Sequence, residues 1–309
     1  MLYKSFIFDS HDGYKLYLNK WYSENSGNYK GIVQIIHGMV EHSDRYADFA
    51  EELCSYGYIV YACDLRGHGR TAQNTEDIGH LPPHGWENIL QDIHRINEYA
   101  KNEYKDIPVF IFGHSMGSFL ARHYISLYGK YINGAIICGT GKLPKFLTAS
   151  GAIIAKHEIK KYGETHRSTL LNKLSFGTYN KRINNPTTEF DWLTRDEAKV
   201  SSYIDDKLCG AVCTCGFYLN MFNGINELQN NKNAMAIPKD MPIFIISGKE
   251  DPVGNYGKAV IGLYKQYKKC GLSKIDYKLY EDCRHELLNE IDRQEVINDI
   301  IKWLLNVCK

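Results

Sequence analysis

Five short and continuously apolar runs recur along the chain, and segments with helical spacing of apolar residues lie between them. Apolar runs of this length are typical of strands that are buried on both faces, as in a parallel sheet. Such strands, alternating with amphipathic helices, predict an α/β domain whose helices cover both faces of the sheet. The five runs are GIVQIIHG, YIVYACDLRG, VFIFGHS, GAIICGT and PIFIISGKED.

Three further strand-like segments complete the predicted sheet. SFIFDS and KLYLNKWY alternate apolar and polar residues and are joined by HDG, which predicts a hairpin with Gly13 in its turn. KIDYKLYE is the last such segment, and we expect it at an edge. The sequence therefore predicts a mostly parallel sheet of eight strands.

The stretch 142–237 interrupts this rhythm, because it contains no convincing buried strand. GAIIAKHEIKKYG and CGFYLNMFNGINEL have helical spacing, whereas KRINNPTTE is typical of a loop. An insertion between strands that end at Cys138 and begin at Ile243 projects from the carboxyl edge of the sheet, where ligands bind in open α/β folds. We therefore expect a core of residues 1–141 and 238–309 and a mainly helical cap of residues 142–237.

The charge and hydropathy of the chain exclude several classes of protein. Lys and Arg total 37 and Asp and Glu total 36, and a nucleic-acid-binding protein needs a clear excess of the former, so no nucleic-acid partner is expected. No apolar run reaches the roughly 18 residues of a membrane span. Lys4, Asp9 and Asp12 interrupt the N-terminus before a signal-peptide core forms. These features predict a cytoplasmic protein.

The nine cysteines are odd in number and scattered, which argues against a disulfide framework. Cys209, Cys213 and Cys215 gather in CGAVCTC, but no second pair of ligands follows at zinc spacing. We therefore expect free thiols and no bound metal.

GHSMG, residues 113–117, matches the pattern G-x-S-x-G in a strand–turn–helix context. A strand precedes Ser115 and an apolar helical face follows it, and the flanking glycines permit a tight, strained turn. This context favours Ser115 as a nucleophile. A serine that only caps the following helix is the alternative interpretation.

A serine hydroxyl needs a base that removes its proton as it attacks. The expected chain order is serine, acid, histidine, with the acid and the histidine in loops after later strands. Asp251 follows such a strand and precedes a proline that stiffens the loop, and His285 follows the last strand. We therefore assign Asp251 as the acid and His285 as the base, and Asp64, Glu250 and Asp282 are less well placed.

An oxyanion hole needs two backbone N–H donors aimed at the developing negative charge. Met116 directly follows the serine, and Met39 follows His37-Gly38 at the end of an earlier strand, so these two residues are the expected donors. His37 is expected to fasten this loop through its ring rather than to act in the reaction. His37 and His114, which adjoins the serine, are retained as candidates for contact with a substrate.

These motifs resemble those of a known family. HGMVEHSDRY, DLRGHGRT, GHSMGS, GKEDPVG and RHELLNE are similar to motifs of monoacylglycerol lipases and lysophospholipase-like serine hydrolases, a serine aminopeptidase S33-type branch of the α/β-hydrolase superfamily. The segment FDWLTRDEAKVSSYIDDKLCG, residues 190–210, resembles bacterial members.

The resemblance implies an α/β-hydrolase fold, Ser115 as nucleophile, Asp251 as acid and His285 as base, with the amides of Met39 and Met116 as oxyanion donors. It also implies a mobile cap over an acyl-binding tunnel and no cofactor. The residues after the His-Gly pair are bulkier here than is usual in the family, which bears on the breadth of substrates rather than on the backbone donor.

The same resemblance predicts a serine hydrolase that acts on lipid-type acyl esters, either monoacylglycerols or lysophospholipids. An amphipathic cap that faces a membrane would suit such a substrate, so a transient peripheral membrane contact is the expected partner interaction besides the substrate. The cap residues expected to line an acyl pocket, or alternatively to pack the cap on the core, are Phe146, Phe217, Met221 and Phe222.

Two alternatives stay open. The same scaffold acts on amides in aminopeptidases, and Asp205 and Asp206 are then candidates to bind the amino group of a substrate. The second alternative is a non-catalytic binding protein, although such a protein has no chemical reason to retain Ser115, Asp251 and His285.

Overall fold

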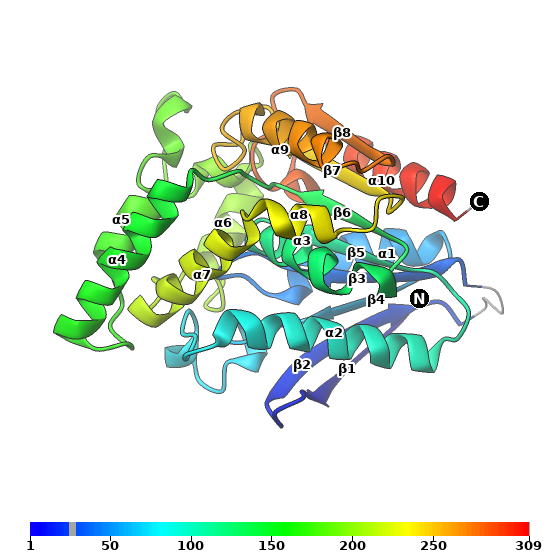
Figure 1. Ribbon diagram of the computed structural model, residues 1–309, viewed down its shortest axis with the longest axis horizontal. Helices are drawn as coiled ribbons and strands as arrows, with labels where there is room; N and C mark the ends of the chain where they lie inside the picture. Colours follow the sequence, from blue (N-terminus) through cyan, green and yellow to red (C-terminus); the bar gives the residue numbers. More distant parts are fainter. Residues whose placement is uncertain (25–28, 309) are drawn as a thin grey trace.

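The computed structural model describes residues 1–24 and 29–308, and its centre is an eight-stranded sheet (Figure 1). The strand order is β1-β2-β4-β3-β5-β6-β7-β8; β2 pairs antiparallel with β1 and with β4, and all other pairs are parallel. The predicted α/β class and mostly parallel sheet are confirmed. The strands are β1 (Leu2–Asp9), β2 (Lys15–Tyr22), β3 (Gly31–Ile36), β4 (Tyr58–Cys63), β5 (Val109–His114), β6 (Gly134–Cys138), β7 (Ile243–Gly248) and β8 (Ile275–Tyr280).

Helices cover both faces of this sheet, as the alternating pattern predicted. One apolar cluster joins the sheet to α1 and α10, and a second joins its other face to α2, α3 and α9. The five inner strands β3 to β7 are buried along their whole length, which is why their sequences are continuously apolar. These helices are α1 (Ala47–Ser55), α2 (Gly85–Glu103), α3 (Met116–Tyr128), α9 (Lys258–Lys269) and α10 (Arg293–Val307).

The chain between β6 and β7 forms a group of helices that extends beyond the sheet, with α4 and α5 on its outer side (Figure 1). α4 packs closely on α7, where a Cβ on Gly151 would lie 2.7 Å from the ring of Phe222. Residues 142–237 are called the inserted segment below. Its helices are α4 (Lys145–Tyr162), α5 (Thr169–Phe176), α6 (Glu197–Asp205), α7 (Cys215–Leu228) and α8 (Asn231–Ala236), with the short 3-10 helices η5 (Tyr179–Arg182) and η6 (Asp191–Leu193).

Local capping explains where several of these helices begin. The side chains of Ser168, Asp196 and Thr214 accept hydrogen bonds from the first turns of α5, α6 and α7. The start of KRINNPTTE, which was expected to be a loop, is the end of η5, and the rest is irregular. Within the described residues, no helix combines the length and the apolar character that are needed to cross a membrane.

Candidate active site

Ser115 occupies a sharp turn between β5 and α3. Its backbone has φ +53° and ψ −120°, a strained conformation for a residue with a side chain. The flanking glycines make the turn possible: a Cβ on Gly117 would lie 2.1 Å from the carbonyl oxygen of Ile36, and one on Gly113 would lie 2.4 Å from the carbonyl oxygen of Gly117. The side chain of Ser115 does not cap α3 but faces a cavity.

Asp251 and His285 form a buried pair at the carboxyl ends of β7 and β8. Nδ1 of His285 donates a hydrogen bond to Oδ1 of Asp251 at 3.0 Å, and both side chains are at most 1% exposed. Asp251 also accepts hydrogen bonds from the backbone N–H of Val253 at 2.8 Å and from Oγ of Ser247 at 3.0 Å. A carboxylate with these three donors keeps the proton of His285 on Nδ1, which leaves Nε2 free to accept a proton.

Ser115 and His285 line the same cavity. Oγ of Ser115 makes no hydrogen bond within residues 1–24 and 29–308, and such contacts commonly tighten only when a substrate binds. The rival acids lie elsewhere: Asp64 accepts hydrogen bonds from the loop around Ser43, and Glu250 and Asp282 are exposed.

The two residues predicted as oxyanion donors, Met39 and Met116, border a cavity beside Ser115. Within the part of the chain that the structure describes, the N–H groups of Met39 and Met116 donate to no acceptor, and both residues border a cavity that contains Ser115. The N–H of Gly38, by contrast, donates to Oε1 of Glu41 at 2.5 Å. The loop approaches the serine closely, because a Cβ on Gly38 would lie 3.0 Å from Cβ of Ser115.

His37 fastens this loop to its neighbour. Its Nδ1 donates to the carbonyl oxygen of Gly38 at 2.8 Å, and its Nε2 accepts from the N–H of Leu65 at 2.9 Å. Burial lowers the pKa of His37 to about 4, so the ring is neutral, as these two bonds require. His37 does not line either cavity at Ser115, unlike the second histidine candidate.

That second candidate, His114, borders the larger cavity but is only 6% exposed. Its Nδ1 lies 3.2 Å from Oε1 of Glu41, and its ring centre lies 4.8 Å from that of His285. Burial opposes protonation, but the hydrogen bond and the charge of Glu41 raise the pKa of His114 above its usual value.

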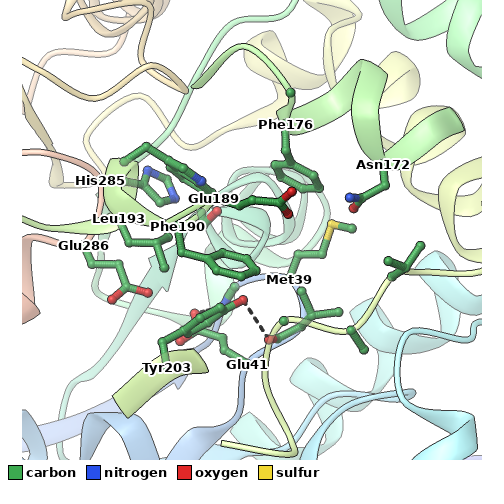
Figure 2. A pocket seen from close by; sticks show the side chains of 18 of the residues that line it. Met39, Glu41, Asn172, Phe176, Glu189, Phe190, Leu193, Tyr203, His285 and Glu286 are labelled. Carbon is green, nitrogen blue, oxygen red and sulfur yellow. Dashed lines mark hydrogen bonds between the residues drawn. The ribbon is translucent and has the colours of Figure 1, made fainter. Parts of the chain in front are cut away.

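The larger cavity at Ser115 has a volume of about 640 Å³ and a mixed polar and aromatic lining (Figure 2). Asn172 and Glu189 contribute polar side chains, and the carboxylate of Glu189 points into the cavity. Tyr203 closes one side, where its hydroxyl donates to the carbonyl oxygen of Val40 at 3.2 Å.

The smaller cavity has a volume of about 330 Å³ and is bordered mainly by apolar side chains. It lies against Ser115 and extends between the core and α4, α5 and α7. Met221 and Phe222 line it, as the sequence predicted, together with residues that include Phe119, Leu147, Ile154, Leu174 and Ile225.

The other two predicted pocket residues lie elsewhere. Phe146 is the second residue of α4 and is 68% exposed. Phe217 is fully buried and packs on His68 with ring centres 5.6 Å apart, which holds α7 on the core. Neither residue borders a cavity that contains Ser115, because each lies on a helix face turned away from it.

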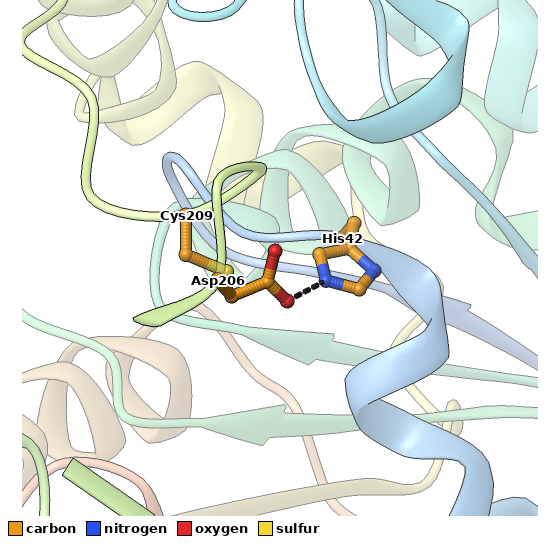
Figure 3. Close-up of side chains that lie close together, drawn as sticks. All are labelled: His42, Asp206 and Cys209. Carbon is orange, nitrogen blue, oxygen red and sulfur yellow. Dashed lines mark hydrogen bonds and ion pairs between the residues drawn. The ribbon is translucent and has the colours of Figure 1, made fainter. Parts of the chain in front are cut away.

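All nine cysteines are free thiols, and Sγ of Cys215 donates to Oε2 of Glu158 at 3.7 Å. Cys209 instead lies near His42 and Asp206, with their ligand atoms within 4.8 Å of one another (Figure 3). Nε2 of His42 and Oδ2 of Asp206 are 2.8 Å apart, and burial raises the pKa of the Cys209 thiol. The thiol of Cys209 stays protonated, and His42 and Asp206 already bind each other. We therefore interpret this group as a contact between the loop of His42 and the inserted segment rather than as a metal site.

Asp205 and Asp206, the candidates for an amino-group site, border neither cavity at Ser115. Asp206 is occupied by His42, and Asp205 is exposed.

Sequence reasoning missed several residues at this site. Trp192, in η6, lies over His285 with ring centres 5.0 Å apart. Arg45 joins Glu41 to Glu286 in a buried ion cluster. All four residues lie within motifs that had been singled out, but nothing in one sequence shows which of their side chains meet.

Comparison with known proteins extends these observations. The family model described as serine aminopeptidase, S33 matches residues 27–292. A monoacylglycerol lipase of Mycolicibacterium smegmatis is 22% identical over 278 residues, which cover 90% of this chain and 89% of that protein.

Solved structures are similar over nearly the whole chain. A highly thermostable carboxyl esterase from Bacillus coagulans, in complex with glycerol, superposes with a TM-score of 0.92 at 28% identity and full coverage of both chains. A soluble variant of the monoglyceride lipase of Saccharomyces cerevisiae, in complex with a substrate analog, has a TM-score of 0.76 at 22% identity, over 99% of this chain and 94% of the other. Both likenesses confirm the predicted fold.

Proposed function

The chain belongs to the serine aminopeptidase S33 family of α/β-hydrolases, and from this premise we propose that it hydrolyses lipid-type acyl esters, monoacylglycerols or lysophospholipids, with Ser115 as the nucleophile. The observation that carries the proposal is the meeting of two unlike cavities at Ser115, one apolar and one partly polar. An ester that joins an acyl chain to a polar alcohol has the same division of character.

In the proposed reaction, Oγ of Ser115 attacks the ester carbonyl while Nε2 of His285 accepts its proton. Asp251 holds the other proton on Nδ1 of His285 and stabilises the imidazolium. The N–H groups of Met39 and Met116 donate to the oxyanion. His285 then protonates the leaving alcohol, and water repeats the sequence on the acyl-enzyme and releases the acid.

We assign the two halves of the proposed substrate to the two cavities. The cavity of about 330 Å³ fits the acyl chain, because its lining is apolar and part of it comes from α4, α5 and α7. The cavity of about 640 Å³ fits the alcohol, since Asn172 and Glu189 offer hydrogen-bonding groups to hydroxyls or a head group. The likeness to monoacylglycerol lipases and a carboxyl esterase supports the same class of substrate.

We also infer that the inserted segment, residues 142–237, is a cap whose outer face contacts a lipid surface. Leu147 and Leu174 border the apolar cavity and yet are 51% and 58% exposed, so apolar surface surrounds its mouth. Lysines on α4 would favour anionic head groups. We define the outer patch as the exposed apolar residues of α4 and α5, Phe146, Leu147, Ile153, Leu170 and Leu174. Lys145, Lys156, Lys160 and Lys161 belong to the same α4.

The nine free thiols favour a reducing compartment, and the cytoplasm is therefore the proposed location. Cell fractionation of the expressed protein would test this proposal.

A hydrolysis panel tests the proposed function. The panel comprises monoacylglycerols, lysophospholipids, short and long p-nitrophenyl esters and aminoacyl amides. We expect the long acyl esters to be hydrolysed fastest and Ser115→Ala to lower their turnover by about 10⁴-fold or more while the protein stays folded. Near-normal ester turnover by Ser115→Ala would contradict the assignment of the nucleophile, and faster turnover of the amides would contradict the ester class.

A further inference from the structure

Glu41 is a buried carboxylate, 3% exposed, in the loop that follows β3. Its Oε1 accepts hydrogen bonds from the N–H of Gly38 at 2.5 Å and from the hydroxyl of Tyr46 at 2.9 Å. Its Oε2 accepts from Nη1 of Arg45 at 2.6 Å. Although burial would raise the pKa of Glu41, Arg45 and a neighbouring histidine hold it well below its usual value, so the group is ionised.

Arg45 connects this carboxylate to a second one. Its guanidinium donates in parallel to both oxygens of Glu286, each at 2.7 Å. Glu286 is 5% exposed and directly follows His285 in the chain. A bidentate pair of this kind fixes the relative orientation of the two side chains as well as the distance between them.

His114 forms the third connection. Its Nδ1 faces Oε1 of Glu41 at 3.2 Å, and its Nε2 faces the backbone carbonyl oxygen of His285 at 3.4 Å. Both partners accept only, so both ring nitrogens must carry a proton for the two contacts to form. His114 is then an imidazolium that joins the loop of Glu41 to the loop of His285.

Three residues of this network are chain neighbours of groups in the proposed reaction. Every link is a hydrogen bond or ion pair between largely buried groups, so water competes little with it. The neighbours are Gly38 beside Met39, His114 beside Ser115 and Glu286 beside His285.

We propose that Glu41 is a positioning residue that sets the oxyanion loop, and that with Arg45, His114 and Glu286 it aligns this loop with the nucleophile and the base. By accepting the N–H of Gly38, Glu41 fixes the His37–Gly38 peptide. Nδ1 of His37 holds the carbonyl oxygen of the next peptide, so the two contacts together direct the N–H of Met39 towards the oxyanion. The inference rests on the proposed function, because it assigns Met39 as a donor in that reaction.

A role in stabilising the folded protein explains this network less well than a role in positioning the loops. Removing charged groups from water costs several kcal/mol per ion, and replacing buried ion clusters with apolar residues is often neutral or stabilising. Apolar residues would fill the same space, but they would not hold the N–H of Gly38 or fork onto Glu286. What the charges supply is a fixed direction for three backbone segments.

The substitution Glu41→Gln tests the proposal, with Glu103→Gln as the matched control. Glu103 likewise pairs with a basic residue, Lys20, and accepts from a tyrosine, Tyr61. It ends α2, which leads into the start of β5, whereas Ser115 follows the other end of that strand, and it borders neither cavity. Three quantities are measured on one p-nitrophenyl ester: kcat, KM and the inhibition constant of a trifluoromethyl ketone. The ketone adds to Ser115 and places an oxyanion in the hole, so its binding reports on transition-state stabilisation.

For Glu41→Gln we expect kcat to fall at least tenfold, KM to change less than about twofold, and the inhibition constant of the ketone to rise by the factor lost in kcat. Glu103→Gln should leave all three unchanged. A Glu41→Gln enzyme with kcat and ketone binding within about twofold of the wild type overturns the proposal, as does a loss carried by KM alone.

A second variant, His114→Asn, serves if Glu41→Gln does not fold, because it removes the link to the carbonyl of His285 and leaves Glu41 with Arg45. We expect the same matched loss of kcat and ketone affinity, at least fivefold, and no change would overturn the network. A wild-type protein that neither hydrolyses esters nor binds the ketone would instead overturn the proposed function, and this inference with it. An active wild type with unaffected variants overturns the network alone.

Discussion

The indole of Trp192 lies 5.0 Å from the imidazole of His285, centre to centre, and its backbone carbonyl accepts the N–H of His285 at 3.4 Å. The inserted segment thus rests directly on the residue assigned as the base. We expect Trp192→Ala to lower kcat/KM for p-nitrophenyl esters by about tenfold to a hundredfold, because His285 loses the surface that orients it. Steady-state kinetics measure the change.

Loss of a large aromatic residue also destabilises a protein, so Trp303→Ala is the control. Trp303 stacks on Phe244 with ring centres 6.0 Å apart, in α10 on the far side of the core from the inserted segment. Both variants should reduce the free energy of unfolding, by up to about 3–5 kcal/mol. A similar loss of kcat/KM in both would show that Trp192 acts through stability only.

The turn at Ser115 should not tolerate a methyl group. Gly117→Ala places a Cβ 2.1 Å from the carbonyl oxygen of Ile36, so β3 or α3 must move. We expect a loss of at least about 3 kcal/mol in the free energy of unfolding, measured with urea. Gly262→Ala in α9 is the matched control, since its Cβ meets nothing within 4 Å, and it should gain about 0.5–1 kcal/mol. Equal effects of the two substitutions would contradict the packing of the turn.

Narrowing the smaller cavity should select against long acyl chains. Ile154 borders this cavity from α4, whereas its neighbour Ile153 is 69% exposed and does not. We expect Ile154→Trp to lower kcat/KM for a long p-nitrophenyl ester by about tenfold and to leave that for the acetate within about twofold. Ile153→Trp should change neither rate with monomeric substrates. Equal loss for both chain lengths would place the acyl group elsewhere.

The outer patch should govern binding to lipid surfaces but not the chemistry. We expect the double substitution Phe146→Ser and Ile153→Ser to weaken binding to anionic phospholipid vesicles at least tenfold, because each apolar side chain contributes about 1.5–3 kcal/mol when fully buried. Turnover of monomeric esters should be unchanged. Ile7→Ser, which removes a 57%-exposed residue from β1, is the control and should bind vesicles normally. Sedimentation with vesicles at low and high salt measures the binding of the double variant and of the control.

Three buried histidines predict a loss of stability in mild acid. Burial lowers the pKa values of His37, His68 and His123 to about 4, 3 and 4, against about 6.5 in an unfolded chain. Below pH 6.5 the unfolded chain therefore binds protons that the folded protein does not. The free energy of unfolding should fall as the pH drops from about 6.5 to 4, by up to about 1.4 kcal/mol per pH unit for each histidine.

Urea unfolding at several pH values checks this slope. The variant His123→Gln keeps a side chain that can accept the hydrogen bond from Nε1 of Trp86, and it should reduce the slope by about one third. A stability that does not change between pH 4.5 and 6.5 would contradict the neutral state of these rings.

Most of the fold and the central residues of the candidate site could be predicted from local sequence patterns. The inner strands were predictable because burial on both faces requires a continuously apolar sequence. Ser115 stood out because only glycine fits on either side of the turn, and Asp251 and His285 because each follows a strand that ends at the same edge. Their assignment as acid and base remains a prediction that kinetic measurements must test. The bounds of the cap also remain a prediction.

What local patterns do not contain is which distant side chains meet. Arg45 and Glu286 are separated by 241 positions, so neither reveals its partner. Phe217 and Phe222 are both apolar residues of α7, but the packing of α4 on that helix decides that only Phe222 faces the smaller cavity. Such choices depend on tertiary packing rather than on periodicity.

The inserted segment leaves the sheet after β6 and returns at β7, and these two strands pair directly, Ala135 opposite Ile243. The excursion therefore interrupts no ladder of the sheet, and the entropy of closing such a loop grows only slowly with its length. The segment can therefore vary in length and sequence without a change in the pairing of the sheet. Substitutions or insertions in it change the lining of the cavities at Ser115, while β7 and β8, which Asp251 and His285 follow, keep their pairing.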